Sequence, residues 1–95
     1  MSVYAIAQSQ ITDEALLEQY VEAAMPTLTA HGVKILAFDA APKSIEGTLE
    51  YPRTVVLEFE SEQAFNQWYE SPEYQAAKKI RKDASIGTFT LVQGM

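Results

Sequence analysis

The sequence predicts an α+β fold whose elements follow one another in the order β-α-β-β-α-β. Two observations carry this prediction. Apolar side chains alternate at period two in four short segments, and they recur at helical spacing in the segments between these strands. The chain has 95 residues, of which 47% are hydrophobic and 21% charged, and these values are typical of one folded domain. We therefore expect residues 1–95 to form a single domain.

The first strand is expected over residues 3–10, where side chains alternate between two faces. Residues 13–31 then change to the spacing of an amphipathic helix, with its apolar side chains on one side and its Glu residues away from them. Thr12 or Asp13 offers an N-cap oxygen, and Gly32 suits the left-handed backbone that often ends a helix.

Pro26 lies inside this predicted helix. A proline has no N–H to donate to the carbonyl of Glu22, four residues earlier. We therefore expect a kink or a break near Met25.

The middle of the chain predicts two further strands, over residues 33–39 and 53–60, both rich in large apolar and β-branched side chains. The connection between them, residues 40–52, is long for a fold of this size. Connections of this length tend to be functional or to take part in assembly.

The last third predicts two short helices and a strand. Ser61 caps the first helix, and Ser71-Pro72 is a favourable start for a second, which should run to about Ala84. Gly87 breaks the pattern, and residues 88–93 alternate as a final strand. The complete order is that of the ferredoxin-like split βαβ unit, a four-stranded antiparallel sheet with its helices packed on one face.

Such a sheet leaves its other face without a cover. The alternation gives one plainly apolar set of side chains that suits the helices, namely Val55, Leu57, Phe59, Phe89 and Leu91. The opposite set contains Val56 and Val92 beside Thr and Glu, and it has more aliphatic bulk than a hydrated face needs. We therefore expect a homodimer in which two sheets pack through their open faces; the alternative is a monomer with a hydrated face.

Charge and composition limit the partners and the chemistry. The formal net charge of −6 disfavours binding to nucleic acids or to anionic membranes, and the basic residues near position 80 suit the negative end of a helix dipole. The chain has no Cys and one His, His31, so no metal-ligand spacing is present, and we expect no metal or cofactor. Neither a signal peptide nor a membrane span is visible, and a cytoplasmic location is expected.

An aromatic and polar segment, residues 68–74, is the strongest candidate for a ligand site. Tyr74 and Arg81 are seven residues apart and share one helix face, so a phenol and a guanidinium would lie beside the indole of Trp68. These groups can hold a small organic acid or an aromatic metabolite in a cleft between helices and sheet. The expected site residues are Trp68, Tyr69, Ser71, Tyr74 and Arg81.

The same residues also have a purely structural interpretation. In it Trp68 and Tyr69 belong to the core, Ser71 is a capping residue, and the Tyr74 hydroxyl donates to the backbone. Arg81 then pairs with a nearby carboxylate, Glu73 or Asp83.

Glu46-Gly47, in the long connection, is a second candidate. A carboxylate turned into a partly buried cleft could act as a general base, and Tyr69 or Tyr74 could then polarise a substrate oxygen. The alternative is a turn with a surface ion pair to Arg53.

Several segments resemble one known family. They are Tyr4-Ala5-Ile6-Ala7, Ile45-Glu46-Gly47, Val55-Val56-Leu57-Glu58-Phe59, Trp68-Tyr69-Glu70-Ser71-Pro72-Glu73-Tyr74-Gln75 with Arg81, and Leu91-Val92-Gln93-Gly94. Together they are similar to the domain-of-unknown-function family 1330 over nearly the whole chain. The resemblance implies a ferredoxin-like fold and a dimeric α/β barrel, but no activity.

Three functions follow as expectations. The first is a homodimer that binds a small organic acid or aromatic metabolite. The second is a cofactor-independent monooxygenase or isomerase, as found in the wider α/β barrel group, with Glu46 as base. The third is a structural or interaction module without a pocket.

Overall fold

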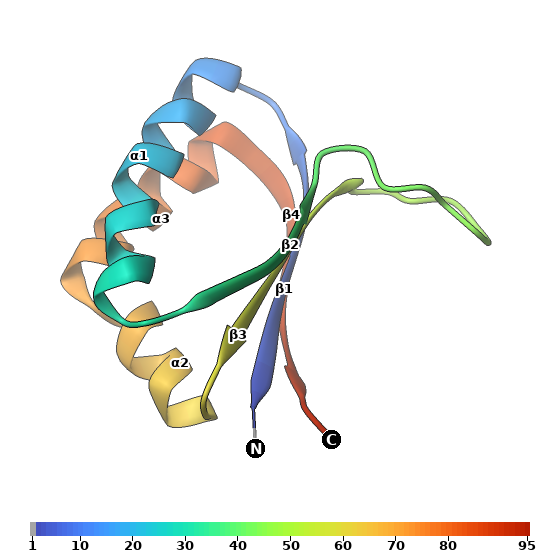
Figure 1. The fold of residues 1–95 in the computed structure, drawn as a ribbon. Coiled ribbons are helices and arrows are strands. Elements are labelled where there is room, and N and C mark those ends of the chain that lie inside the picture. Colours follow the sequence, from blue (N-terminus) through green and yellow to red (C-terminus); the bar gives the residue numbers. More distant parts are fainter. Residues whose placement is uncertain (1) are drawn as a thin grey trace.

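The structure is a computed structural model; it describes residues 2–95 and confirms the predicted order of elements. The elements are β1 (Val3–Ile11), α1 (Glu14–Ala30), β2 (Lys34–Asp39), β3 (Arg53–Phe59), α2 (Glu62–Tyr69), α3 (Pro72–Ala84) and β4 (Ser85–Gln93). The strands form one antiparallel sheet in the order β2-β3-β1-β4. The helices lie on one face of this ferredoxin-like sheet, and the other face is open (Figure 1).

Helix α1 begins and ends where the sequence predicts, but it does not break. The Asp13 carboxylate accepts a hydrogen bond from the backbone N–H of Leu16 at 3.1 Å, and Gly32 has the left-handed φ of 64°. The helix continues through Pro26 to Ala30. The expected break near Met25 is wrong, because burial of residues before and after Pro26 outweighs the loss of one backbone hydrogen bond.

The two short helices follow their predicted caps. The Ser61 side chain accepts from the N–H of Ala64 at 3.1 Å. The Ser71 hydroxyl accepts from the N–H of Tyr74 at 3.3 Å and donates to the carbonyl of Trp68 at 2.7 Å. Ser71 therefore joins the end of α2 to the start of α3, which fixes Trp68 and Tyr74 relative to each other.

Strand β4 begins three residues earlier than predicted, at Ser85, and Gly87 lies within it. Gly87 pairs with Ser9 of β1, and a Cβ atom built on Gly87 would lie only 2.0 Å from the carbonyl oxygen of Gln8. The glycine therefore allows a close approach between two strands and does not end a strand.

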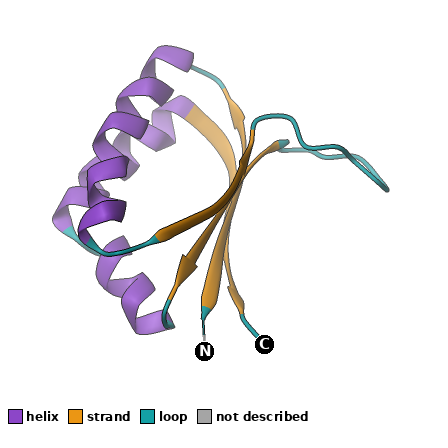
Figure 2. Ribbon diagram, viewed as in Figure 1, coloured by secondary structure: helices purple, strands orange, loops and turns teal. Residues whose placement is uncertain are grey.

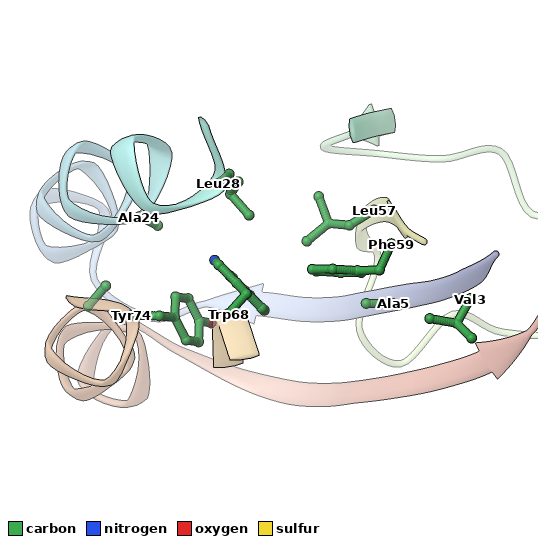
Figure 3. Close-up of a cluster of buried hydrophobic side chains, with 9 residues drawn as sticks. Val3, Ala5, Ala24, Leu28, Leu57, Phe59, Trp68 and Tyr74 are labelled. Atoms are coloured by element: carbon green, nitrogen blue, oxygen red, sulfur yellow. The ribbon is translucent and has the colours of Figure 1, made fainter. Parts of the chain in front are cut away.

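The strand register arranges the helix-facing side chains in rows across the sheet. Val3 pairs with Phe59 and Ala5 with Leu57, and all four side chains are buried. This end of the sheet is filled by the aromatic side chains of α2 and α3, with Trp68 and Tyr74 side by side against α1 (Figure 3). The core therefore occupies one end of the helix-facing surface.

The connection between β2 and β3, residues 40–52, projects beyond the sheet on the side away from the helices (Figure 2). We refer to it as the arm. Nearly all its residues are exposed, including Ile45 at 81%. Within residues 2–95, no helix is both long and apolar enough to cross a membrane.

Candidate functional site

A cavity of about 820 Å³ lies between the helices and the sheet, on the half of the sheet that the core leaves unfilled. Its walls come from α1, from α3 and from all four strands, with Trp68 of α2 and Tyr51 from the connection between β2 and β3. The space exists because the facing side chains are small. Ala7, Ser9 and Gly87 line it from the sheet, and Ala24 lines it from α1. Where the larger Phe59 faces the helices, the layers are packed.

The cavity lining carries positive charge only. Arg53, Arg81 and Lys82 line it, and within the described chain no Asp, Glu or His side chain does. The one ion pair within residues 2–95 is Lys34–Glu58, at 4.0 Å between Nζ and Oε1, so none of the three cations has a carboxylate partner. In a chain of net charge −6, this concentration of unpaired cations marks a place suited to an anion.

The two arginines differ in their surroundings. The Arg81 Nε atom is buried and has no hydrogen-bond partner among the described residues, and its guanidinium carbon lies 5.8 Å from the centre of the Phe89 ring. The Arg53 guanidinium carbon lies 4.8 Å from the centre of the Phe38 ring. Burial lowers the pKa of Arg53, and the neighbouring Tyr20 raises it in part. Each guanidinium therefore lies over an aromatic ring, and no Asp or Glu of the described residues forms an ion pair with it.

A pair of tyrosine hydroxyls connects the two helices that cover the cavity. The oxygen atoms of Tyr20, on α1, and Tyr74, on α3, lie 3.0 Å apart. Burial is the main reason why the pKa of Tyr74 is raised, with Tyr20 adding to the rise and Arg81 opposing it. Tyr74 therefore stays protonated at neutral pH and is suited to hydrogen bonding, not to proton abstraction.

Three of the predicted site residues line the cavity together: Trp68, Tyr74 and Arg81. The spacing of seven residues places Tyr74 and Arg81 on one helix face, as expected. Trp68 is also part of the core, as the structural interpretation has it, and its Nε1 donates to the Thr27 hydroxyl at 3.0 Å. Two other parts of that interpretation are wrong, because Tyr74 contacts the Tyr20 hydroxyl and Arg81 pairs with neither Glu73 nor Asp83.

The other predicted site residues lie outside this lining. Tyr69 stacks on Phe65 with ring centres 5.5 Å apart, and the Lys78 ammonium lies 5.0 Å from the centre of its ring. Ser71 caps α3. Glu46 is exposed on the arm, and the predicted surface pair between it and Arg53 is not formed.

The lining residues that were not assigned to the site from the sequence include Tyr20, Arg53 and Lys82. Tyr20 belongs to the apolar side of α1, so the sequence predicts a core position for it and does not indicate that its hydroxyl contacts Tyr74. Lys82 belongs to a basic cluster that is typical of a helix C-terminus, and it does lie in the last turn of α3. Only the pairing of Arg53 with Ser9 brings that arginine to the cavity, so its place depends on the register of the sheet.

Comparison with known proteins identifies the family and the fold. The family DUF1330, described as a domain of unknown function, matches residues 2–95. A search of the curated proteins found no match. Among solved structures, a protein of unknown function from Rhodopseudomonas palustris superposes with a TM-score of 0.84 at 14% identity, over 99% of this chain and 82% of that one.

Two further structures share the fold. A dimeric protein of unknown function with a ferredoxin-like fold, from Bacteroides fragilis, has a TM-score of 0.67 at 16% identity and covers 98% of this chain and 96% of its own. SnoaB, a cofactor-independent oxygenase from Streptomyces nogalater, has a TM-score of 0.69 at 9% identity and covers 99% and 93%. At these identities the likeness concerns the fold alone.

Proposed function

This chain belongs to the DUF1330 family, and we propose that it binds an organic acid or an acid-bearing aromatic metabolite in the cavity between helices and sheet, as a homodimer. The observation that carries the proposal is the lining of the cavity. Among residues 2–95, three cations face it and no carboxylate does, although acidic residues outnumber basic ones by 13 to 7 in the whole chain. An anion in the cavity would gain charge-assisted hydrogen bonds that the protein itself does not use.

The proposed roles follow from the positions of the side chains. Arg81 binds the acid group, because its guanidinium has no carboxylate partner in the described part of the chain and can present two N–H groups to one carboxylate. Tyr74 is buried and its hydroxyl contacts that of Tyr20, so Tyr74 positions the Tyr20 hydroxyl for a second polar contact. Trp68 is buried and supports the inner wall of the cavity from behind, while the exposed ring of Phe38 gives the ligand an aromatic surface.

Replacing Arg81 by Gln tests this assignment. We expect 2-naphthoate to bind the wild-type protein and to bind Arg81→Gln about 10- to 100-fold more weakly, since a hydrogen bond to a charged group contributes about 1.5–3 kcal/mol. Isothermal titration calorimetry measures both affinities. Lys79→Gln is the matched control, because Lys79 is exposed on the same helix and lies outside the cavity lining. Equal affinity in wild type and Arg81→Gln contradicts the assignment.

A cofactor-independent enzyme is the alternative, and SnoaB gives an example of such a protein on this fold. The lining of the cavity does not favour this function for the present chain. It has no Asp, Glu or His among the described residues to act as a base, and Glu46 is exposed on the arm. Binding is therefore the function that the geometry supports better.

The homodimer is proposed to form through the open face of the sheet. Ile6 pairs with Val56 in the two central strands, on the face opposite the helices, and Val92 of β4 is 44% exposed. A second copy would cover these apolar side chains. The B. fragilis protein, which is dimeric, supports this proposal by its similar fold.

A carboxylate placed at the centre of that face should separate the two copies. We expect the wild type to sediment at twice the mass of one chain, and Val56→Glu to sediment as a monomer, because two unpaired charges would be buried per dimer. Gln19→Glu adds the same charge at an exposed position of α1 and should stay dimeric. Analytical ultracentrifugation decides, and a monomeric wild type at micromolar concentration would overturn the proposal.

A further inference from the structure

We infer that the cavity selects bulky amphipathic anions, with an apolar and largely aromatic body and one acid group, over small acids the size of acetate. This inference rests on the proposed function and narrows the class of ligand. The first argument is size. The volume of about 820 Å³ falls in the range of pockets that enclose ligands of drug size. An acid of four or five heavy atoms would fill a small part of this space and leave the apolar walls in contact with water.

The second argument is the exposed apolar side chains of the cavity. Val21 and Met25 from α1, Ile35 and Phe38 from β2, and Ile86 from β4 all line it. Each of the five is between 37% and 58% exposed. These five are half of the ten large apolar side chains that are exposed within residues 2–95. A ligand with an apolar body would remove them from water, whereas a small acid would not reach them.

The third argument is the separation of charge from apolar surface inside the cavity. The register places Ser9 and Arg53 opposite each other in one row, and Ala7 and Val55 in the next row towards the core. Arg81 and Lys82 come from the C-terminal turn of α3, and Ile11 and Ser85 pair at the same end of the sheet. The cations therefore gather at one end, and among the described residues the other end of the cavity, lined by Val55, Leu57 and Trp68, carries no charge. A ligand that matches this arrangement carries its charge at one end only.

The fourth argument is the contact of each arginine with an aromatic ring. Arg53 lies over Phe38 and Arg81 over Phe89. An acid group bound by either guanidinium is thus held beside an aromatic side chain. The atoms attached to that acid group would contact these rings first, and an aryl group would make edge or stacking contacts with them.

Two fluorescent probes separate the contributions of charge and bulk. 1-Anilinonaphthalene-8-sulfonate and N-phenyl-1-naphthylamine share one aromatic body, and only the first carries an anionic group. We expect the sulfonate to bind with one site per chain, and the neutral probe to bind at least tenfold more weakly. Excess 2-naphthoate should displace the sulfonate, while acetate at a hundredfold higher concentration should not.

A variant that shrinks the cavity shows where the probe binds. Ala7→Leu extends a side chain into the cavity from the sheet, and we expect it to weaken sulfonate binding at least tenfold. Ala76→Leu adds the same atoms at an exposed position of α3 and should bind as the wild type does. Circular dichroism of both variants verifies that each is folded.

The possible failures are distinct. Displacement of the sulfonate by acetate and 2-naphthoate at equal concentrations, or full affinity in folded Ala7→Leu, overturns the inference but leaves an anion site in place. Equal binding of the charged and neutral probes, together with no effect of Arg81→Gln, overturns the proposed function itself. If Ala7→Leu does not fold, the competition between acetate and 2-naphthoate tests the inference, because that experiment uses wild-type protein only.

Discussion

Replacement of Trp68 by Ala is expected to lower the free energy of unfolding by about 3–5 kcal/mol. The indole is 1% exposed and lies between the sheet and both long helices, with ring centres 4.0 Å from Tyr74 and 5.4 Å from Phe59. The substitution removes these contacts and joins a new void to an existing cavity. For a domain of this size, each kcal/mol lowers the midpoint of thermal unfolding by about 4–8 °C.

Two further variants identify the cause of that loss. Trp68→Phe keeps an aromatic ring but removes the donor to the Thr27 hydroxyl, which still donates to the carbonyl of Ala24 at 2.6 Å. We expect this variant to lose about 1–2 kcal/mol. Phe38→Ala removes an aromatic side chain that is 58% exposed and should lose less than about 1 kcal/mol. Urea denaturation measures the free energy of unfolding of all three variants. If Trp68→Phe were as unstable as Trp68→Ala, packing of the aromatic ring would not be the main cause of the loss.

Gly87→Ala is expected to be the second strongly destabilising change, with a loss of about 3 kcal/mol or more. The new Cβ would lie 2.0 Å from the Gln8 carbonyl oxygen and 2.7 Å from the Ser9 Cα, both of which are backbone atoms of a central strand. Neither atom can move aside as the end of a flexible side chain could. Strands β1 and β4 would have to separate over the cavity.

Gly47→Ala is the matched control for this change. Gly47 lies in the arm with φ of 80°, and among the described residues no atom beyond its two chain neighbours lies within 4 Å of its built Cβ. Its substitution therefore costs only the strain of a left-handed backbone, about 1 kcal/mol. Thermal or urea unfolding compares the two alanine variants. Equal stability in both would show that the close approach at Gly87 relaxes without cost.

Much of the fold could be predicted because its signals are local. The caps at Asp13, Ser61 and Ser71 each act on an N–H three residues away, and the alternation within the strands needs no distant partner. The two errors occur where distant contacts decide. Helix α1 continues through Pro26 because residues on both sides of the proline are buried. Gly87 is needed because any Cβ at this position would collide with the carbonyl oxygen of Gln8.

The site was predictable to the extent that it follows one helix. Tyr74 and Arg81 lie on a common face of α3, so their spacing brings them to the same cavity. Arg53 reaches that cavity through pairing with Ser9, 44 positions earlier in the chain, and the Tyr20 hydroxyl meets Tyr74 across two helices. Within residues 2–95, no carboxylate lines the cavity, but this property involves residues from all of its walls together. It therefore cannot be predicted from any single segment of the sequence.

The helix-facing surface of the sheet has a packed core at one end and a cavity at the other, and this arrangement affects how proteins of this family can diverge in sequence. Phe59 and Trp68 secure the scaffold at one end, while Ala7, Ser9 and Gly87 shape an empty chamber at the other. Substitutions at Ala7 or Ser9 can change the shape of the cavity while Phe59 and Trp68 stay unchanged. Substitutions that change the cavity therefore cost little stability, and few compensatory mutations are needed to keep the domain folded.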